Sequence, residues 1–266
     1  MSLDSSDVEI SVKSKRAYRR IKLKSQNLEE AGRIAAELGL GPVASRVLAA
    51  RGYRADARTE SFIKPALRTG LPDPAKLKDV DRACSLIAAA LEAKQPIAVC
   101  CDFDVDGLSG GAIVSHFLRR IGGRVEVFVP DRFVDGYGLN QAVVKKIAES
   151  GFGLLIAIDY GSTNLVELAL ARQLGLKTIV VDHHHIGTEA PQVDAFINPH
   201  QAECGFGDGI LCAAGLAWYL IIRLRKKLPQ ARDLDAKSYL DLACLGTICD
   251  MVPLVGANRV IAKRGL

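Results

Sequence analysis

The middle of the chain alternates short apolar runs with segments of helical periodicity. Continuous apolar runs predict buried strands, and apolar residues at three- and four-residue spacing predict the helices that cover them. Strands are expected over residues 97–101, 125–129, 154–158, 178–181 and, more weakly, 195–197. Helices are expected between them, over residues 108–121, 140–149 and 164–174. This order predicts an α/β fold, a Rossmann-like parallel sheet with helices on both faces.

The segments on either side of this core show helical patterns. Before it, helices are expected within residues 27–51 and over residues 79–93, and after it over residues 211–224 and 236–245. We therefore expect the sheet to be preceded by a helical N-terminal segment and followed by helices. The predicted division is a polar, basic N-terminal arm (1–25), a helical segment that packs on the core (26–95) and an α/β domain (96–266).

Acidic residues and histidines gather where the predicted strands and apolar runs end. Asp102, Asp104 and Asp106 follow the first strand, and Asp159 follows the third. The remaining candidates are Asp131 and Arg132 after the second strand, the run Asp182, His183, His184 and His185 after the fourth, and Asp250 after a later apolar run. Because functional groups of open parallel sheets collect at the carboxyl ends of the strands, we expect one shared crevice.

Carboxylates combined with imidazoles indicate a metal site. This donor set suits Mn²⁺ or Mg²⁺ better than a structural zinc. The excess of carboxylates over histidines further suggests two ions, which would activate a water and stabilise charge on a phosphoryl group. The sequence thus predicts hydrolysis of a phosphate ester.

Other interpretations of the same residues stay open at this point. Asp106, which precedes Gly107, fits a helix N-cap, as does a lone aspartate such as Asp159. Consecutive histidines also occur in solvated loops. A calcium loop is excluded for residues 102–113, because Ile113 stands at the twelfth position, where an EF-hand needs glutamate, and because a strand precedes the loop.

Composition narrows the class of protein without identifying it. The 266-residue chain is 49% hydrophobic and carries a formal net charge of +5, which is compatible with a nucleic-acid partner. The basic stretch 13–24 is read either as a solvated arm or as a contact with nucleic acid phosphates. The seven cysteines are unpatterned and suggest a reduced, cytoplasmic protein. Apolar runs all fall short of the roughly 20 residues that span a bilayer, so we expect no membrane association.

Four ordered motifs resemble those of the DHH phosphoesterase superfamily. They are DFDVDG (102–107), IDYGS (158–162), the defining VDHH (181–184) and GTICDMVPL (246–254). Three accessory segments, LKDVDRA (77–83), DGYGLN (135–140) and INP (197–199), are similar to those of the RecJ-like exonucleases within it. The resemblance covers the chain from about residue 40 to its end.

The resemblance implies a 5′-to-3′ exonuclease that acts on single-stranded DNA with Mn²⁺ or Mg²⁺ and releases mononucleotides. Carried over by motif, Asp106 and Asp159 are candidate bridging ligands. His184 would contact the scissile phosphate or act as an acid, and Arg132 would clamp a phosphate. The implied metal ligands are Asp102, held as the weakest, Asp104, Asp106, Asp159, His183 and Asp250.

The chain departs from the family pattern at several points. Tyr160 stands where asparagine is usual, which puts a hydrogen bond near the metal ligands in doubt, and Cys100 and Cys101 replace small residues. The DHH-associated domain and the nucleic-acid-binding OB-like β-barrel of RecJ-like proteins have no counterpart after residue 266. We therefore expect a metal domain with weak nuclease activity at best. Alternatives are another phosphoesterase of the superfamily, acting on short oligonucleotides or cyclic dinucleotides, and a non-catalytic scaffold module.

Overall fold

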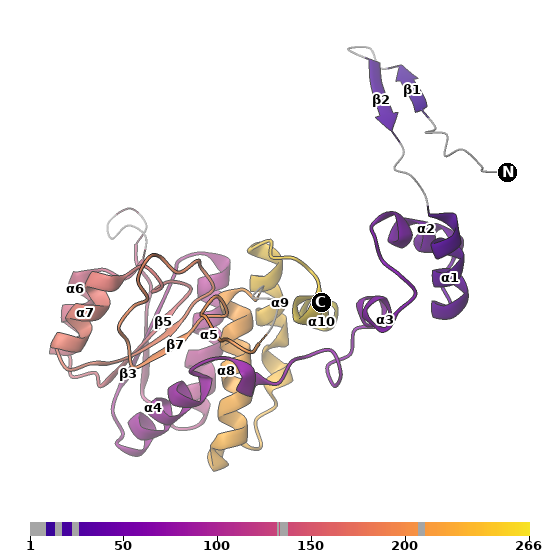
Figure 1. The fold of residues 1–266 in the computed structure, drawn as a ribbon. Helices are drawn as coiled ribbons and strands as arrows, with labels where there is room; N and C mark the ends of the chain where they lie inside the picture. Colours follow the sequence, from indigo (N-terminus) through magenta and orange to yellow (C-terminus); the bar gives the residue numbers. More distant parts are fainter. Residues whose placement is uncertain (1–8, 14–17, 23–26, 132, 134–137, 207–210) are drawn as a thin grey trace. The chain divides into compact units, whose positions relative to one another are not determined.

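The computed structural model describes residues 9–13, 18–22, 27–131, 133, 138–206 and 211–266. The chain divides into two compact units, residues 1–65 and residues 66–266 (Figure 1). Each unit is described by itself below.

The first unit combines a strand pair with three helices. Its elements are the antiparallel strands β1 (Glu9–Lys13) and β2 (Tyr18–Lys22) and the helices α1 (Leu28–Leu38), α2 (Pro42–Ala50) and α3 (Ala57–Ile63). The strand pair was not expected within the basic arm. Its first strand, EISVK, does alternate apolar and polar residues, and this period of two was the signal for it.

The second unit contains a five-stranded parallel sheet in the order β4-β3-β5-β6-β7, which confirms the predicted fold class. The strands are β3 (Ile97–Cys101), β4 (Val125–Phe128), β5 (Leu154–Ile158), β6 (Lys177–Val181) and β7 (Ala195–Ile197). The intervening helices are α5 (Val105–Arg120), α6 (Gln141–Glu149) and α7 (Leu165–Gln173).

Helices flank this α/β core in the sequence as well. A 3₁₀ turn (Pro74–Lys76) and α4 (Val80–Glu92) precede it. The elements that follow are α8 (Ala213–Lys227), two 3₁₀ turns (Pro229–Ala231 and Ala236–Tyr239), α9 (Leu240–Cys249) and α10 (Gly256–Gly265). Among the described helices, none is long and apolar enough to cross a membrane.

Alternate residues of each strand enter two separate apolar cores, one on each face of the sheet. In β3, Ile97, Val99 and Cys101 join the core that contains residues of α4, α5, α8 and α9. Ala98 and Cys100 join the opposite core, beneath α6 and α7. Because β3 is covered on both faces, all five of its residues are buried, which explains its unbroken apolar sequence.

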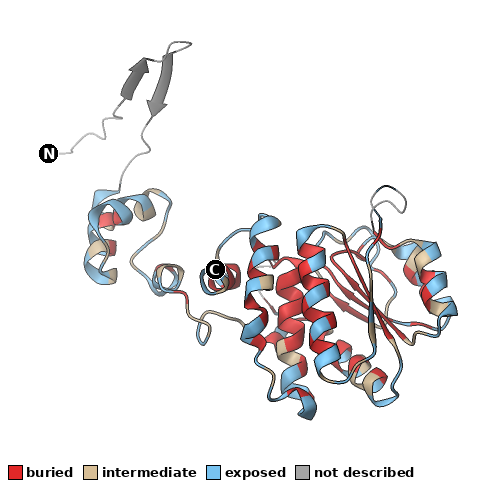
Figure 2. Cartoon of the chain, turned by 180° about the vertical axis from the view of Figure 1, so that it is seen from behind, coloured by how far each residue is buried: buried red, intermediate tan, exposed pale blue. Residues whose placement is uncertain are grey.

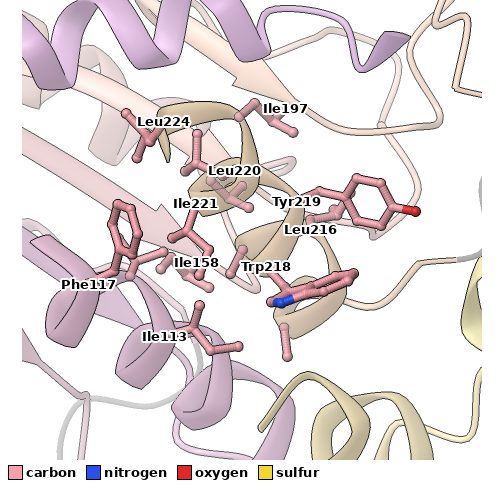
Figure 3. Close-up of a cluster of buried hydrophobic side chains, with 14 of the residues drawn as sticks. Ile113, Phe117, Ile158, Ile197, Leu216, Trp218, Tyr219, Leu220, Ile221 and Leu224 are labelled. Atoms are coloured by element: carbon pink, nitrogen blue, oxygen red, sulfur yellow. The ribbon is translucent and has the colours of Figure 1, made fainter. Parts of the chain in front are cut away.

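Helix α8 is the central element of the larger core. Figure 3 shows its side chains, such as Leu216 and Ile221, packed with Ile158 of β5 and Phe117 of α5. Every residue from Ala213 to Ile221 is buried, so this helix lacks an exposed stripe until its last turns. Figure 2 shows the same concentration of buried residues in the second unit, whereas the helices nearest the N-terminus are exposed over most of their surface.

An ion-pair cluster joins α4 to α8 at the surface. The guanidinium of Arg223 donates two hydrogen bonds to the carboxylate of Asp81, at 2.7 and 2.9 Å, and the ammonium of Lys227 lies 2.9 Å from the same carboxylate. The hydrogen bonds from Arg223 lower the pKa of Asp81 to about 2. The folded state therefore favours the ionised carboxylate.

We expect Asp81→Asn to lower the free energy of unfolding by about 0.5–1 kcal/mol at neutral pH, the upper range for exposed ion pairs. Because the folded-state pKa lies below the ordinary value of about 3.9, the contribution is complete above pH 5 and declines as pH falls toward 2. Urea unfolding at pH 7, 5, 4 and 3 should show the gap between the two proteins narrowing. Asp241→Asn, on an exposed α9 carboxylate, is the control; a gap that widens on acidification would contradict the assignment.

Candidate metal centre

The sheet has one point at which the order of its strands reverses. The chain passes from β3 outward to β4 and then returns to β5 on the other side of β3. In sheets of this kind the connections leave β3 and β5 toward opposite faces, and this opens a crevice at their carboxyl ends. Asp102 follows β3 and Asp159 follows β5, so both lie at the reversal.

The loop after β3 carries the three alternating aspartates, which have three different surroundings. Asp102 is buried and accepts a hydrogen bond from the Phe103 amide, and burial raises its pKa. Asp104, not Asp106, is the N-cap of α5, because its Oδ1 accepts from the Gly107 amide at 2.9 Å. The helix consequently begins at Val105, three residues before its predicted start, and Asp106 lies in its first turn.

The N-terminus of α8 holds the carboxylate of Asp106. The amides of Ala213 and Ala214 donate to its Oδ2 and Oδ1, at 2.7 and 2.8 Å. The positive end of the helix dipole thus stabilises a carboxylate that is only 1% exposed. Gly246 of α9 lies directly behind it, since a Cβ at this position would stand 2.5 Å from Asp106 Oδ1 and 2.5 Å from Ala214 Cβ.

Asp159 occupies a backbone conformation that is rare for residues other than glycine. Its φ is +68°, and it is followed by Gly161 at φ +121°. The Asp159 carboxyl is buried, and burial together with the charges of Asp106 and Asp104 raises its pKa to about 10. A group of buried carboxylates with this mutual repulsion favours a bound cation.

Asp182 organises the two histidines that follow it after β6. Its Oδ1 accepts hydrogen bonds from the His183 and His184 amides and from Nδ1 of His184, at 2.8, 3.2 and 2.7 Å, while its Oδ2 accepts from the Ser162 amide. Although burial opposes it, these bonds from His184 and Ser162 hold the pKa of Asp182 below its usual range. The same bond raises the pKa of His184 and sets the orientation of its ring.

The imidazole of His183 lies at the centre of the carboxylates. Its Nε2 is 3.3 Å from Asp159 Oδ1, 3.7 Å from Asp106 Oδ2 and 3.7 Å from Asp250 Oδ2. Both His183 Nε2 and Asp250 Oδ2 are buried atoms without a hydrogen-bond partner among the described residues. A cation bound beside these two atoms would give each of them the partner that it lacks.

Three overlapping groups of side chains have metal-ligand spacing, with the donor atoms of each group within 4.8 Å of one another. The groups are Asp102, Asp104 and Asp159; Asp106, His183 and Asp250; and Asp159, His183 and His184. Asp159 and His183 each belong to two groups. The structure therefore brings together all six predicted ligands and His184 from four separate segments of the chain. These carboxylates and imidazoles are a donor set that fits Mn²⁺ or Mg²⁺.

Comparison with known protein families assigns the region that carries these residues to a family. Residues 96–247 match the DHH family, N-terminal domain. The chain belongs to the DHH family. The match begins one residue before β3 and includes every described donor except Asp250.

Relatives and solved structures of DHH proteins agree with this assignment. The chain is 34% identical over 230 residues to the single-stranded-DNA-specific exonuclease RecJ of Bacillus subtilis, covering 86% of this chain and 28% of that protein. It resembles the crystal structure of Thermus thermophilus RecJ with Mn²⁺ (TM-score 0.73, 31% identity, 90% of this chain and 33% of that one). It also resembles that protein with Mg²⁺ (TM-score 0.61, 27% identity, 90% and 29%). The chain thus spans a third or less of the length of these relatives.

Some predicted features of the DHH site lie elsewhere or outside the described residues. Arg132 and residues 135–137 are outside them. Asn140, from the same accessory segment, caps α6 by accepting from the Val143 amide. Tyr160 is buried in the core beneath α6 and α7, and it lines a pocket of about 270 Å³ with Phe128 and Lys146. The side chain that replaces the usual asparagine therefore fills apolar space.

Sequence reasoning missed the residues that position the ligands. Asp182 received no role of its own, although it is the first residue of the defining motif. Asn198, in the quoted INP segment, donates to the Ser162 hydroxyl and to the His184 carbonyl, both at 2.9 Å. The amides of Ala213 and Ala214, which donate to Asp106, could not be recognised from the side chains in the sequence. They are free to donate because they lie at the start of α8.

We expect Gly246→Ala to weaken Mn²⁺ binding by about 10- to 100-fold, the range for changes that disturb groups supporting a ligand. The added methyl group must displace either the Asp106 carboxylate or α8, so the donor atoms shift while none is removed. Titration calorimetry with Mn²⁺ measures the effect. Gly32→Ala, where a new Cβ meets no atom within 4 Å, is the matched control, and equal Mn²⁺ affinities in both variants would contradict the prediction.

Proposed function

We propose that this chain is the metal domain of a RecJ-like exonuclease. In this proposal it hydrolyses phosphodiester bonds of single-stranded DNA from the 5′ end and releases mononucleotides, with two Mn²⁺ or Mg²⁺ ions as cofactors. The observation that carries it is the set of three overlapping donor groups around His183 and Asp159. The name of the Bacillus subtilis relative and the ions of the Thermus thermophilus structures support the substrate and the cofactors.

The overlap of the donor groups suggests how two ions would be shared. Asp102 and Asp104 would serve one ion, and Asp106 and Asp250 the other. Asp159, whose carboxylate belongs to two groups, would be shared by the ions, and His183 would serve one ion through a single ring nitrogen. Asp106 was the second bridging candidate from the sequence; its Oδ2 lies 3.7 Å from His183 Nε2, and both its oxygens already accept backbone hydrogen bonds.

Bound divalent cations would supply a water of lowered pKa and charge stabilisation at the phosphoryl group. The chain's own residues would position the substrate phosphate and supply a proton. His184, with Nδ1 bonded to Asp182 and a raised pKa, is suited to hold a proton and a positive charge beside a phosphate. Arg132 is kept as the proposed phosphate clamp, because a guanidinium matches phosphate geometry.

The remaining parts of the proposal concern organisation and location. We assign the phosphoesterase domain to residues 96–266, preceded by the helical segment 26–95 and the basic arm 1–25. Weak activity stays part of the proposal; the chain covers 28% of the Bacillus subtilis relative and 33% of the Thermus thermophilus chain. A cytoplasmic location is supported by the seven cysteines, all of which are free thiols.

We expect Asp159→Asn to reduce degradation of single-stranded DNA by at least about 100-fold, because it removes an oxygen donor that two of the groups share. The assay follows release of mononucleotides from a 5′-labelled oligothymidylate in Mn²⁺, with EDTA as the blank. Asp241→Asn, an exposed carboxylate on α9, should leave the rate unchanged.

A panel of substrates distinguishes an exonuclease from another phosphoesterase of the superfamily. Preference for long single strands over dinucleotides and cyclic dinucleotides supports the exonuclease, and the reverse preference would reassign the chain to another phosphoesterase of the superfamily. Absence of Mn²⁺ binding by calorimetry in the unaltered chain would overturn the proposal in favour of a scaffold module.

A further inference from the structure

The net positive charge of the chain belongs entirely to the first unit. Residues 1–65 contain 13 Lys and Arg against 8 Asp and Glu, whereas residues 66–266 contain 22 of each. The second unit, which carries the acidic metal centre, therefore has no net charge with which to attract a polyanion. Residues 1–65 therefore carry the excess positive charge that would attract a polyanion at long range.

A polar pocket in the first unit concentrates part of this charge. It has a volume of about 360 Å³ and lies in the turn between α2 and α3. Three arginines line it, together with one carboxylate and three other residues: Arg51, Arg54, Arg58, Asp56, Gly52, Tyr53 and Thr59.

The backbone of this turn is anchored at both ends. Gly52 takes φ +83°, which ends α2, and the Tyr53 amide donates back to the Leu48 carbonyl at 3.1 Å. The Ala55 amide donates to the carboxylate of Glu30 on α1, at 2.8 Å. The Asp56 carboxylate caps α3 through the Thr59 amide, also at 2.8 Å. Arg51 and Arg54 thus belong to a turn whose shape is determined by other residues, and Arg58 lies in the first turn of α3.

The three arginines are available to a ligand. All three are exposed, and none forms an ion pair within the part of the chain that the structure describes. Glu30, the α1 carboxylate that reaches this turn, accepts a hydrogen bond from the Ala55 amide and forms an ion pair with Arg33. Asp56 is the one acidic group in the pocket, and it leaves a local excess of two positive charges.

An aromatic ring accompanies the charge. Tyr53 lines the pocket and packs on Phe62 of α3, with ring centroids 4.9 Å apart, so its ring is supported from one side. Guanidinium groups bind phosphates bidentately, and adjacent aromatic rings stack on bases without sequence preference. Arginines beside a supported tyrosine are therefore a combination suited to binding a single strand.

We infer that the Arg51–Arg54–Arg58 pocket binds the phosphodiester backbone of single-stranded DNA, as a non-catalytic site that holds the strand. The inference rests on the proposed function, because it takes its ligand from the proposed substrate. The binding needs no metal ion, so it is separable from hydrolysis.

Fluorescence anisotropy of a labelled oligothymidylate in EDTA, over a range of NaCl concentrations, tests this site in the intact chain. The test protein carries R51Q, R54Q and R58Q. The control carries R124Q, K145Q and K237Q, three exposed residues of the second unit that remove the same charge. Circular dichroism verifies that both remain folded, and the single variant R54Q gives the effect of one contact.

We expect the test protein to bind at least about 10-fold more weakly than the unaltered chain at low salt. The slope of log K against log [NaCl] should become shallower by about 2, since each single-strand phosphate contact contributes about 0.7. The control should bind within about twofold of the unaltered chain. Equal weakening in both triple variants, or equal competition by a polyglutamate peptide, would overturn the inference.

Assays of hydrolysis distinguish failure of the arginine site from failure of the proposed exonuclease function. With Mn²⁺ present, the test protein should show a raised KM and an unchanged kcat. If the unaltered chain binds the oligothymidylate in EDTA but never cleaves it, the proposed function fails and the binding site stands. If it cleaves the strand and the arginine substitutions leave both binding and KM unaffected, the binding site is wrong and the proposed function stands.

Discussion

The site depends on one interaction, the pair of hydrogen bonds from the start of α8 to the carboxylate of Asp106. A buried carboxylate is costly unless donors surround it, and here two amides with the positive end of a helix dipole supply them. The same bonds attach α8 to α5 at the point where the donors converge. Packing of the larger core and geometry of the metal centre are consequently coupled, since a shift of α8 moves a donor atom.

The other candidate ligands are also held in place by residues that are not ligands themselves. Asp182 directs His183 and His184, Asn198 ties the Ser162 hydroxyl to the His184 carbonyl, and Gly246 leaves the space that Asp106 occupies. Asp182, Asn198, Ser162 and Gly246 carry no metal-ligand role in the proposal. They matter because donor atoms at 3.3 to 3.7 Å from His183 Nε2 repel one another and hold that spacing only when other groups oppose the repulsion.

Charge is distributed between the two units according to what each would contact. The second unit balances its 22 basic and 22 acidic residues and places buried aspartates at the edge of the sheet. The first unit carries the net charge of +5 on its basic arm and helices. A metal centre and a strand-binding surface have opposite electrostatic requirements, because one collects cations and the other collects phosphates.

The parallel sheet could be predicted from the sequence, since strands buried on both faces require unbroken apolar runs such as residues 97–101. Acidic residues and histidines at strand ends also indicated the types of candidate metal ligand, although helix caps and a solvated loop remained open for single residues. Three features were not predicted. Asp104 rather than Asp106 caps α5, Asp159 has a positive φ, and β1 pairs with β2. The amides that hold Asp106 became known from the folded chain, because residues 107 positions apart meet there and backbone donors leave no signal in the side-chain pattern. The tertiary structure likewise decided that Arg51, Arg54 and Arg58 share one pocket, since a turn closed by Gly52 and Glu30 gathers them.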